Sequence, residues 1–326
     1  MACREVTARR AESIVVVAIA CATIIRVHSS RGIRVSPLRH IRRYAAVTLF
    51  NLLLATPVFA QPALWVVHNA RTTVYLFGTV HLLPNDTDWH YPALDKALAA
   101  SDSLTIELTD DDATTMQALV LQYGLDPSHP LSDKLSAAEN ATLAQAAQTA
   151  GIPGGTQTLE IMRPWLAGVT LAVAPLVKAG LDPAHGVDKQ LKAQMIQAGK
   201  PVSGMETSEQ QIRFLADLPP DVELAFLRST LHDIDKGPTE LTELVSAWKN
   251  GDTATIARIE DEDVRQQAPA LYQRLLVQRN QTWAGKIVAM LQQPGTIFIA
   301  VGAGHLAGPD SVQAQLHKLG IDAVRQ

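Results

Sequence analysis

One short pattern occurs near both ends of the sequence and constrains the fold more than any other feature. Phe77-Gly78-Thr79-Val80-His81-Leu82 closes one aliphatic run, and Val301-Gly302-Ala303-Gly304-His305-Leu306 closes another. Each copy predicts a buried strand that ends at a glycine, with a histidine three residues later in the following loop. The two histidines are 224 residues apart. A sheet that brings them together must therefore join strands from opposite ends of the chain.

The remaining apolar patterns predict a small sheet and many helices. Runs at 63–67 and 73–77 around the turn-like Asn69-Ala70-Arg71 predict a hairpin. Further strands are expected at 104–106, 200–205, 296–301 and 321–324, and helices at 91–100, from Thr207 onward and at 311–319. From 111 to about 293, alanine-rich amphipathic segments broken by prolines predict mostly helix. We expect an α/β (α+β) fold in which a small central mixed sheet, built from N- and C-terminal strands, is covered by a long helical insert, as a single domain over 61–326.

The first 60 residues predict a leader. Arg39, Arg42 and Arg43 precede a 12-residue apolar stretch, and Thr56-Pro57-Val58-Phe59-Ala60 offers small residues for signal-peptide cleavage. This predicts export, with a periplasmic or secreted protein after cleavage near Ala60. A second basic and apolar segment lies upstream, which suggests that translation starts near 35–38 and that residues 1–35 are not translated. Cys3 and Cys21 are the two cysteines of the chain, so we expect no thiolate chemistry in the mature protein.

The charge distribution excludes several classes of partner. Residues 61–326 carry 19 basic and 30 acidic side chains, a net charge of −11. Such an acidic body lacks the basic surface that nucleic acids bind, and it is compatible with cations. No apolar run reaches the ~18 to 20 residues that a bilayer span needs, so no transmembrane span is expected in the mature chain.

Two glutamates occupy positions comparable to those of the histidines. Glu107 follows the strand at 104–106, and Glu206 follows the strand at 200–205. Because ligands bind at the carboxyl ends of strands in α/β sheets, His81, His305, Glu107 and Glu206 are candidates for one site. Nitrogen and oxygen donors suit Zn, Mn, Co or Fe. Taken singly, each histidine also fits a loop residue with a local hydrogen bond, and each glutamate fits a helix cap.

Arg279 and Asn280 lie in a predicted helix, with Trp283 one turn further on the same face. From the residues alone, the simplest interpretation is an arginine at the surface and a tryptophan in the core. The alternative is an arginine that binds a carboxylate or stabilises an oxyanion.

These motifs resemble the TraB/GumN family, which is related to the Tiki-type metalloproteases. The resemblance rests on the two Gly-x-x-His motifs and on Ile-Glu-Leu, Gly-Met-Glu-Thr-x-x-Glu-Gln and Arg-Asn-x-x-Trp-Ala, at 106–108, 204–210 and 279–284. It extends from about Leu64 to Val324. Arg163-Pro164-Trp165, Gly186-Val187-Asp188 and Trp248-Lys249-Asn250-Gly251-Asp252 are also similar to family segments.

The resemblance implies a divalent-metal-dependent hydrolase of the bacterial cell envelope, a peptidase acting on peptide or protein substrates, with manganese or cobalt favoured over zinc or iron. His81, Glu107 and His305 would bind the metal, Glu206 would act as general base and Arg279 would stabilise the oxyanion or bind a substrate carboxylate. The two glutamates could exchange roles. Gly78, Gly302, Gly304 and Asn280 would support the site. The alternatives are a non-catalytic periplasmic binding protein for a peptide signal, a haem-like ligand or a polysaccharide, and an envelope or exopolysaccharide assembly factor.

Overall fold

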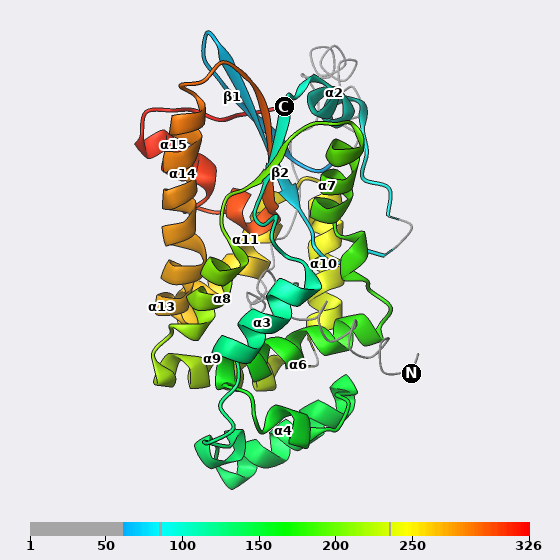
Figure 1. The fold of residues 1–326 in the computed structure, drawn as a ribbon, viewed down its shortest axis with the longest axis vertical. Coiled ribbons are helices and arrows are strands. Elements are labelled where there is room, and N and C mark those ends of the chain that lie inside the picture. The colour runs from blue at the N-terminus through cyan, green and yellow to red at the C-terminus, as the bar shows by residue number, and fades with distance from the viewer. Residues whose placement is uncertain (1–60, 85–86, 235) are drawn as a thin grey trace, which may run out of the picture.

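The computed structural model describes residues 61–84, 87–234 and 236–326 (Figure 1). The predicted signal sequence, the translation start and both cysteines lie outside these residues. The described chain folds as predicted into a mixed α/β structure with one six-stranded sheet. The strands are β1 (Leu64–His68), β2 (Thr72–Thr79), β3 (Ser103–Ile106), β4 (Val202–Gly204), β5 (Gly295–Gly302) and β6 (Val324–Arg325).

The sheet order confirms that the two ends of the chain pair. The order is β4-β3-β5-β2-β1-β6, and β5 lies parallel to both β2 and β3. β4 extends this parallel part beyond β3, whereas β1 pairs antiparallel with both β2 and β6. The hairpin and the edge strand are where the sequence predicts them, except that β6 begins at Val324 rather than at 321. Since β2, β5, β3 and β4 run in the same direction, their carboxyl ends meet at one edge of the sheet.

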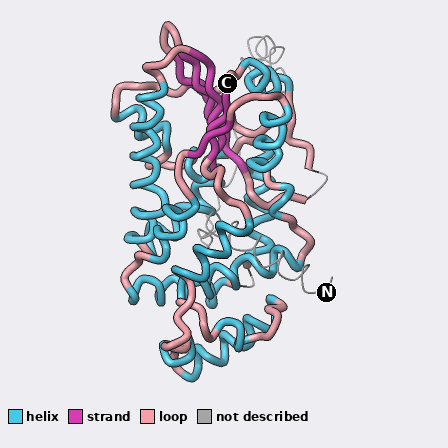
Figure 2. Tube along the Cα trace, in the orientation of Figure 1, coloured by secondary structure: helices cyan, strands magenta, loops and turns pink. Residues whose placement is uncertain are grey.

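Helices cover both faces of the sheet (Figures 1 and 2). One face packs against α14 (Gln278–Met290) and α15 (Val312–Lys318), with Trp283 and Leu316 fully buried there. The opposite face packs against α2 (Pro92–Ala100), α7 (Val187–Gln197) and α10 (Gly237–Lys249). This arrangement explains the nearly continuous apolar sequence of β2 and β5, because a strand covered on both faces has no solvent-exposed side.

The predicted helical insert is present between β3 and β5, and the strand β4 interrupts it as expected. α4 (Ala137–Ala150), α6 (Pro164–Lys178) and α9 (Pro220–Asp233) form an apolar cluster of their own at the end of the molecule away from the sheet. The other segments of the insert are α3 (Ala113–Tyr123), η1 (Leu131–Lys134), α5 (Thr156–Leu159), η2 (Pro183–His185), α8 (Ser208–Ala216), α11 (Thr253–Ala257), η3 (Arg258–Glu262), α12 (Asp263–Gln267), α13 (Pro269–Tyr272) and η4 (Gln273–Val277), of which η3 and η4 are π-helical. A 3-10 turn, η5 (Ala303–Leu306), follows β5.

Local sequence explains how α8 begins beside the sheet edge. Thr207 Oγ1 accepts a hydrogen bond from the Gln210 backbone, and the Gln210 side chain accepts one from the Thr207 backbone. This capping box satisfies two backbone donors at the start of the helix. It fixes the turn that carries Glu206 directly before it.

Across the part of the chain that the structure describes, no helix has the length and apolar character needed to cross a bilayer.

Candidate active site at the carboxyl edge of the sheet

The structure brings the predicted site residues together at the edge where the parallel strands end. His81 follows β2, Glu107 follows β3, Glu206 follows β4 and His305 lies in η5 after β5. Arg279 reaches this edge from the first turn of α14. Five side chains from five segments therefore converge on one place.

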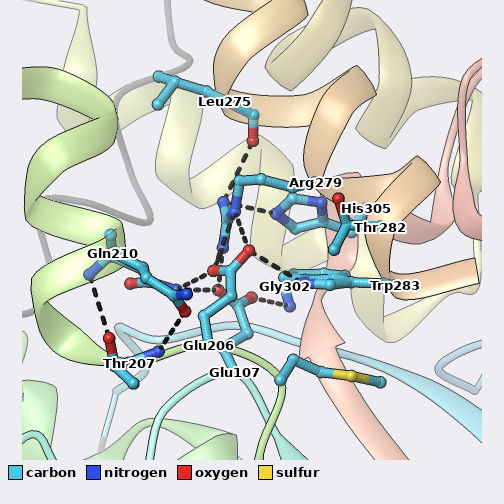
Figure 3. Close-up of polar contacts among 12 residues, drawn as sticks. Glu107, Glu206, Thr207, Gln210, Leu275, Arg279, Thr282, Trp283, Gly302 and His305 are labelled. Carbon is cyan, nitrogen blue, oxygen red and sulfur yellow. Dashed lines mark hydrogen bonds and ion pairs between the residues drawn. The ribbon is translucent and has the colours of Figure 1, made fainter. Parts of the chain in front are cut away.

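Arg279 is the centre of the polar network (Figure 3). Its Nε lies 3.0 and 3.1 Å from the two oxygens of Glu206, and its Nη2 lies 2.8 Å from Glu107 Oε2 and 2.9 Å from Glu206 Oε2. Its Nη1 donates to the carbonyl of Leu275 and to His305 Nε2. All five N–H groups of the guanidinium thus have an acceptor.

The simplest expectation for Arg279, a surface charge, is wrong. The residue is 4% exposed, and its guanidinium lies 4.8 Å from the centre of the Trp283 ring. Burial lowers the pKa of Arg279, but the carboxylates of Glu206 and Glu107 outweigh burial and raise it. The guanidinium stays charged and compensates the two buried carboxylates.

Glu206 is held on both oxygens. Besides Arg279, the indole Nε1 of Trp283 donates to Oε1 at 2.9 Å, and Gln211 Nε2 donates to Oε2 at 3.1 Å. The second hydrogen of the Gln211 amide serves Glu107 Oε2, at 2.9 Å. Glu206 is therefore an anchor for Arg279, with its oxygens directed at protein donors.

His305 has a defined tautomer because both ring nitrogens have partners. Its Nδ1 lies 2.6 Å from Asn280 Oδ1, an acceptor, and its Nε2 faces the N–H of Arg279 at 3.0 Å. The Asn280 amide nitrogen donates to the carbonyl of Asp310, which fixes the orientation of the amide. The ring is neutral with its proton on Nδ1, consistent with burial and the neighbouring Arg279, which lower the pKa of His305 to about 3. Asn280 thus orients the His305 ring.

His81 presents an unused nitrogen to the site. Its Nδ1 lies 3.0 Å from Asp188 Oδ1, and its buried Nε2 has no hydrogen-bond partner among the described residues. Burial lowers the pKa of His81, but Asp188 and then Glu107 outweigh burial and raise it to about 9. Asp188 fixes the direction in which Nε2 points, as carboxylates do beside functional histidines.

One carboxylate oxygen of Glu107, Oε1, faces the His81 ring. This oxygen accepts the backbone N–H of Gly302 at 2.7 Å and lies 4.0 Å from His81 Nε2. Burial raises the pKa of Glu107, but Arg279 and the neighbouring histidines outweigh it and hold the pKa well below its usual range. Glu107 is ionised at every pH at which the protein would function.

The glycines allow this close approach. A Cβ at Gly302 would lie 3.2 Å from Glu107 Oε1, 3.4 Å from His81 Nε2 and 3.7 Å from His305 Cδ2. The two histidines and the acid therefore surround one backbone position. At Gly78 a Cβ would lie 3.1 Å from the Cα of Ala303, so this glycine lets the loop after β5 pack on β2.

Two recesses open beside His81 and Glu107, which line both. The larger encloses about 720 Å³ including its mouth, and is also lined by Arg279, His305, Gly304 and Glu260. The smaller encloses about 490 Å³ and is also lined by Asp188, Asp111 and Gln211. The His81–Glu107 pair therefore borders both recesses.

Four side chains at this edge have no role that the sequence motifs predict: Asp188, Gln211, Glu260 and Asp261. Asp188 lies in the family-like segment 186–188, which was the available signal. Gln211 directly follows the capping box and carries no pattern of its own. Glu260 and Asp261 lie in the π-helical turn η3, and nothing in their local sequence separates them from solvent-exposed acids.

Two atoms at this edge are of the kinds that a divalent metal binds. They are the unpartnered Nε2 of His81 and the Oε1 of Glu107, a nitrogen and an oxygen donor 4.0 Å apart. His305 would join them only if Arg279 moved away from its Nε2. Within residues 61–84, 87–234 and 236–326, no group of three or more histidine, cysteine or acidic side chains is arranged to hold a metal.

Comparison with known proteins agrees with the resemblance. The uncharacterized protein YbaP of Escherichia coli (strain K12) is 28% identical over 261 residues, which cover 79% of this chain and 93% of YbaP. An uncharacterized protein of Treponema pallidum (strain Nichols) is 23% identical over 267 residues, covering 76% of this chain and 78% of that protein. No solved structure matches the chain. Residues 63–325, which include every strand and every site residue described above, match the TraB/PrgY/gumN family, and the chain belongs to that family.

Proposed function

We propose that this protein hydrolyses peptide bonds at the His81–Glu107 centre. The observation that carries the proposal is the pair of facing atoms beside Gly302: His81 Nε2, which has no partner and is aimed by Asp188, and Glu107 Oε1, which accepts only the Gly302 N–H. Both residues line two recesses, in which a peptide could bind. We further propose that the protein acts in the cell envelope after export and cleavage near Ala60.

We also propose that the centre uses a divalent metal, manganese or cobalt. His81 Nε2 and Glu107 would hold it, and His305 would be a third ligand after release from Arg279. When bound, such an ion polarises the carbonyl to be cleaved and makes water more acidic. Asp188 would keep the Nδ1 proton of His81, so that the Nε2 lone pair points at the site.

The other side chains hold this pair in place. Arg279 has all five donors committed, so an oxyanion would have to displace one of its partners. Each oxygen of Glu206 has at least two protein donors, whereas Glu107 Oε1 has the Gly302 N–H alone, so Glu206 is the less suited of the two to act as general base. The geometry therefore supports Arg279 and Glu206 as positioning residues that fix Glu107 and His305. Their Ala variants would disturb the arrangement of the site rather than remove a reacting group.

The same two atoms also suit a mechanism without an ion, because they differ in charge. Glu107 Oε1 would accept the proton of the attacking water, and His81 Nε2 would donate a proton to the leaving amine. The two atoms are 4.0 Å apart, so one water molecule could contact both.

A peptide-library digest followed by mass spectrometry tests the function. We expect cleavage by the purified protein, suppression by a chelator and recovery with manganese. Cleavage that resists the chelator and is lost in His81→Ala would assign the acid–base mechanism instead. Retention of peptides without any cleavage would contradict the proposal and identify a binding protein.

A further inference from the structure

Two neighbouring acids, Glu260 and Asp261, lie beside the centre, where His81 is the favourable charge for Glu260 and Arg265 for Asp261. Both belong to the π-helical turn η3. Arg258, the arginine of that turn, pairs with Glu243 instead. Asp261 is 3% exposed, and neither of its oxygens has a hydrogen-bond partner within the described residues. Because a buried carboxylate without partners is costly, burial favours the protonated form of Asp261 and leaves Glu260 as the acid of the pair that can carry charge beside the recess.

Two glycines after β5 bring these acids to the site. A Cβ at Gly304 would lie 2.0 Å from Glu260 Oε2, and a Cβ at Gly308 would lie 2.8 Å from Asp261 Oδ2. Any other residue at Gly304 would push Glu260 away from the crevice. The packing of η3 on this loop therefore requires glycine, which has no side chain, at positions 304 and 308. π-helical turns often occur at functional sites.

The larger recess has an acidic end and an aliphatic wall. Glu260 and Asp261 line it together with His81 and Glu107. Leu241, Leu244, Val264, Leu275 and Leu276 line the remainder. Glu107 is already neutralised by Arg279, whereas Glu260 is only half-buried and lies open to the recess. The recess thus combines the acidic group of Glu260 with an apolar surface, which is the complement of a cationic group attached to an aliphatic chain.

We propose that Glu260, backed by Asp261, binds the protonated primary amine of a peptide substrate, and that the leucine wall receives the adjoining aliphatic side chain. The inference rests on the proposed function for its position beside the cleaved bond. Because the acids and the His81–Glu107 pair share one recess, an α-ammonium at Glu260 places the first peptide bond of the substrate near His81. The protein would then remove aliphatic residues from free amino termini.

Charge supports this assignment. Burial raises the pKa of Glu260 to about 7, and burial together with Glu260 raises the pKa of Asp261 to about 9. The ionised form of either group is therefore poorly stabilised by the protein itself. An ammonium ligand would supply the missing positive charge.

Binding measurements made with chelator present and at low temperature, where mass spectrometry finds every ligand intact, test the subsite independently of hydrolysis. Leucinamide, N-acetyl-leucinamide and Nα-acetyl-lysinamide are titrated calorimetrically into the wild-type protein, Glu260→Gln and Glu262→Gln. Glu262 is exposed on the same turn, so its variant carries the same charge change and serves as the matched control. We expect leucinamide to bind the wild type and the control equally and Glu260→Gln at least 10-fold more weakly, whereas N-acetyl-leucinamide does not bind.

The other outcomes are also decisive. Binding of Nα-acetyl-lysinamide in place of leucinamide would support the subsite and assign the amine to a lysine side chain. Equal binding of the acetylated and free leucinamides, or unchanged binding to Glu260→Gln, would overturn the proposal. A loss of manganese affinity in Glu260→Gln would also overturn it, because Glu260 would then hold an ion rather than substrate. Absence of peptide cleavage would refute the proposed function without changing these results.

Discussion

Arg279 Nη1 lies 3.0 Å from His305 Nε2, so a cation and a neutral imidazole lie side by side in the interior of the site. The contact is possible because Asn280, the next residue of the same helix, takes the proton of the other ring nitrogen. One turn of α14 thus sets both the charge and the tautomer of a histidine 25 residues away in sequence.

Removing the guanidinium should strongly destabilise the protein. Arg279→Met leaves Glu107 and Glu206 buried without a cation, and we expect the free energy of unfolding to fall by about 3–5 kcal/mol. Urea denaturation measures the loss. The exposed Arg213→Met should change stability by less than about 1 kcal/mol. The double variant Arg279→Met/Glu206→Gln should be more stable than the summed stability losses of its two single variants predict. If it is not, the two side chains are not coupled.

Asp188→Asn should lower the pKa of His81 from about 9 towards its ordinary value of 6.5, because it removes the nearest favourable charge. NMR titration of the imidazole measures this pKa in the metal-free protein. Since the folded pKa is raised, the stabilisation is fully present below pH 6.5 and is lost as the pH rises through about 9. The stability gap between wild type and variant should therefore close above pH 9. Asp95→Asn, beside the exposed His90, is the control, and an unchanged pKa of His81 in Asp188→Asn would contradict the geometry.

Asp261→Asn should become increasingly stabilising as the pH rises. The pKa of Asp261 is raised from 3.8 to about 9, so the folded wild type keeps a proton that the unfolded chain releases. This lowers wild-type stability progressively from about pH 4 to pH 9, by up to about 1.4 kcal/mol per pH unit. The asparagine does not titrate. Urea denaturation at pH 5, 7 and 9 measures the difference in the free energy of unfolding between variant and wild type. The exposed Asp133→Asn is the control and should show no comparable trend. A pH-independent difference for Asp261→Asn would show that Asp261 is not protonated.

Gly304→Ala should disturb the site although the backbone there tolerates alanine. Its Cβ would lie 2.0 Å from Glu260 Oε2, and we expect a loss of about 1–3 kcal/mol from the resulting overpacking. Gly285→Ala, in a helix with no atom within 4 Å of the new Cβ, should instead gain about 0.5–1 kcal/mol. Thermal denaturation compares them. The loss should be largely reversed in Gly304→Ala/Glu260→Ala, and a loss that persists would show that Glu260 is not the obstructing group.

The convergence of His81 and His305 was predictable because each follows a strand that ends at a glycine. Two parallel strands with the same ending bring the same positions together, whatever the separation along the chain. Glu107 follows the same logic. This part of the site is a consequence of sheet topology and is visible in the sequence.

The burial of Arg279 and the position of Glu260 depend instead on contacts between distant segments. A helical arginine one turn from a core tryptophan fits a surface residue equally well, until two carboxylates from β3 and β4 are placed beside it. Glu260 is brought inward by a π-helical turn, where the spacing of an ordinary helix does not predict which residues face the core. Neither arrangement has a local signal.

The central claim is that the His81–Glu107 pair hydrolyses peptides, and a comparison of two histidine variants tests it most directly. Peptide cleavage is measured by mass spectrometry for the wild type, His81→Ala and His129→Ala, whose side chain is 72% exposed and away from the site. We predict equal rates for the wild type and His129→Ala, and a rate at least about 100-fold lower for His81→Ala at a temperature at which circular dichroism shows that variant to be folded. Cleavage by His81→Ala at the wild-type rate would contradict the account.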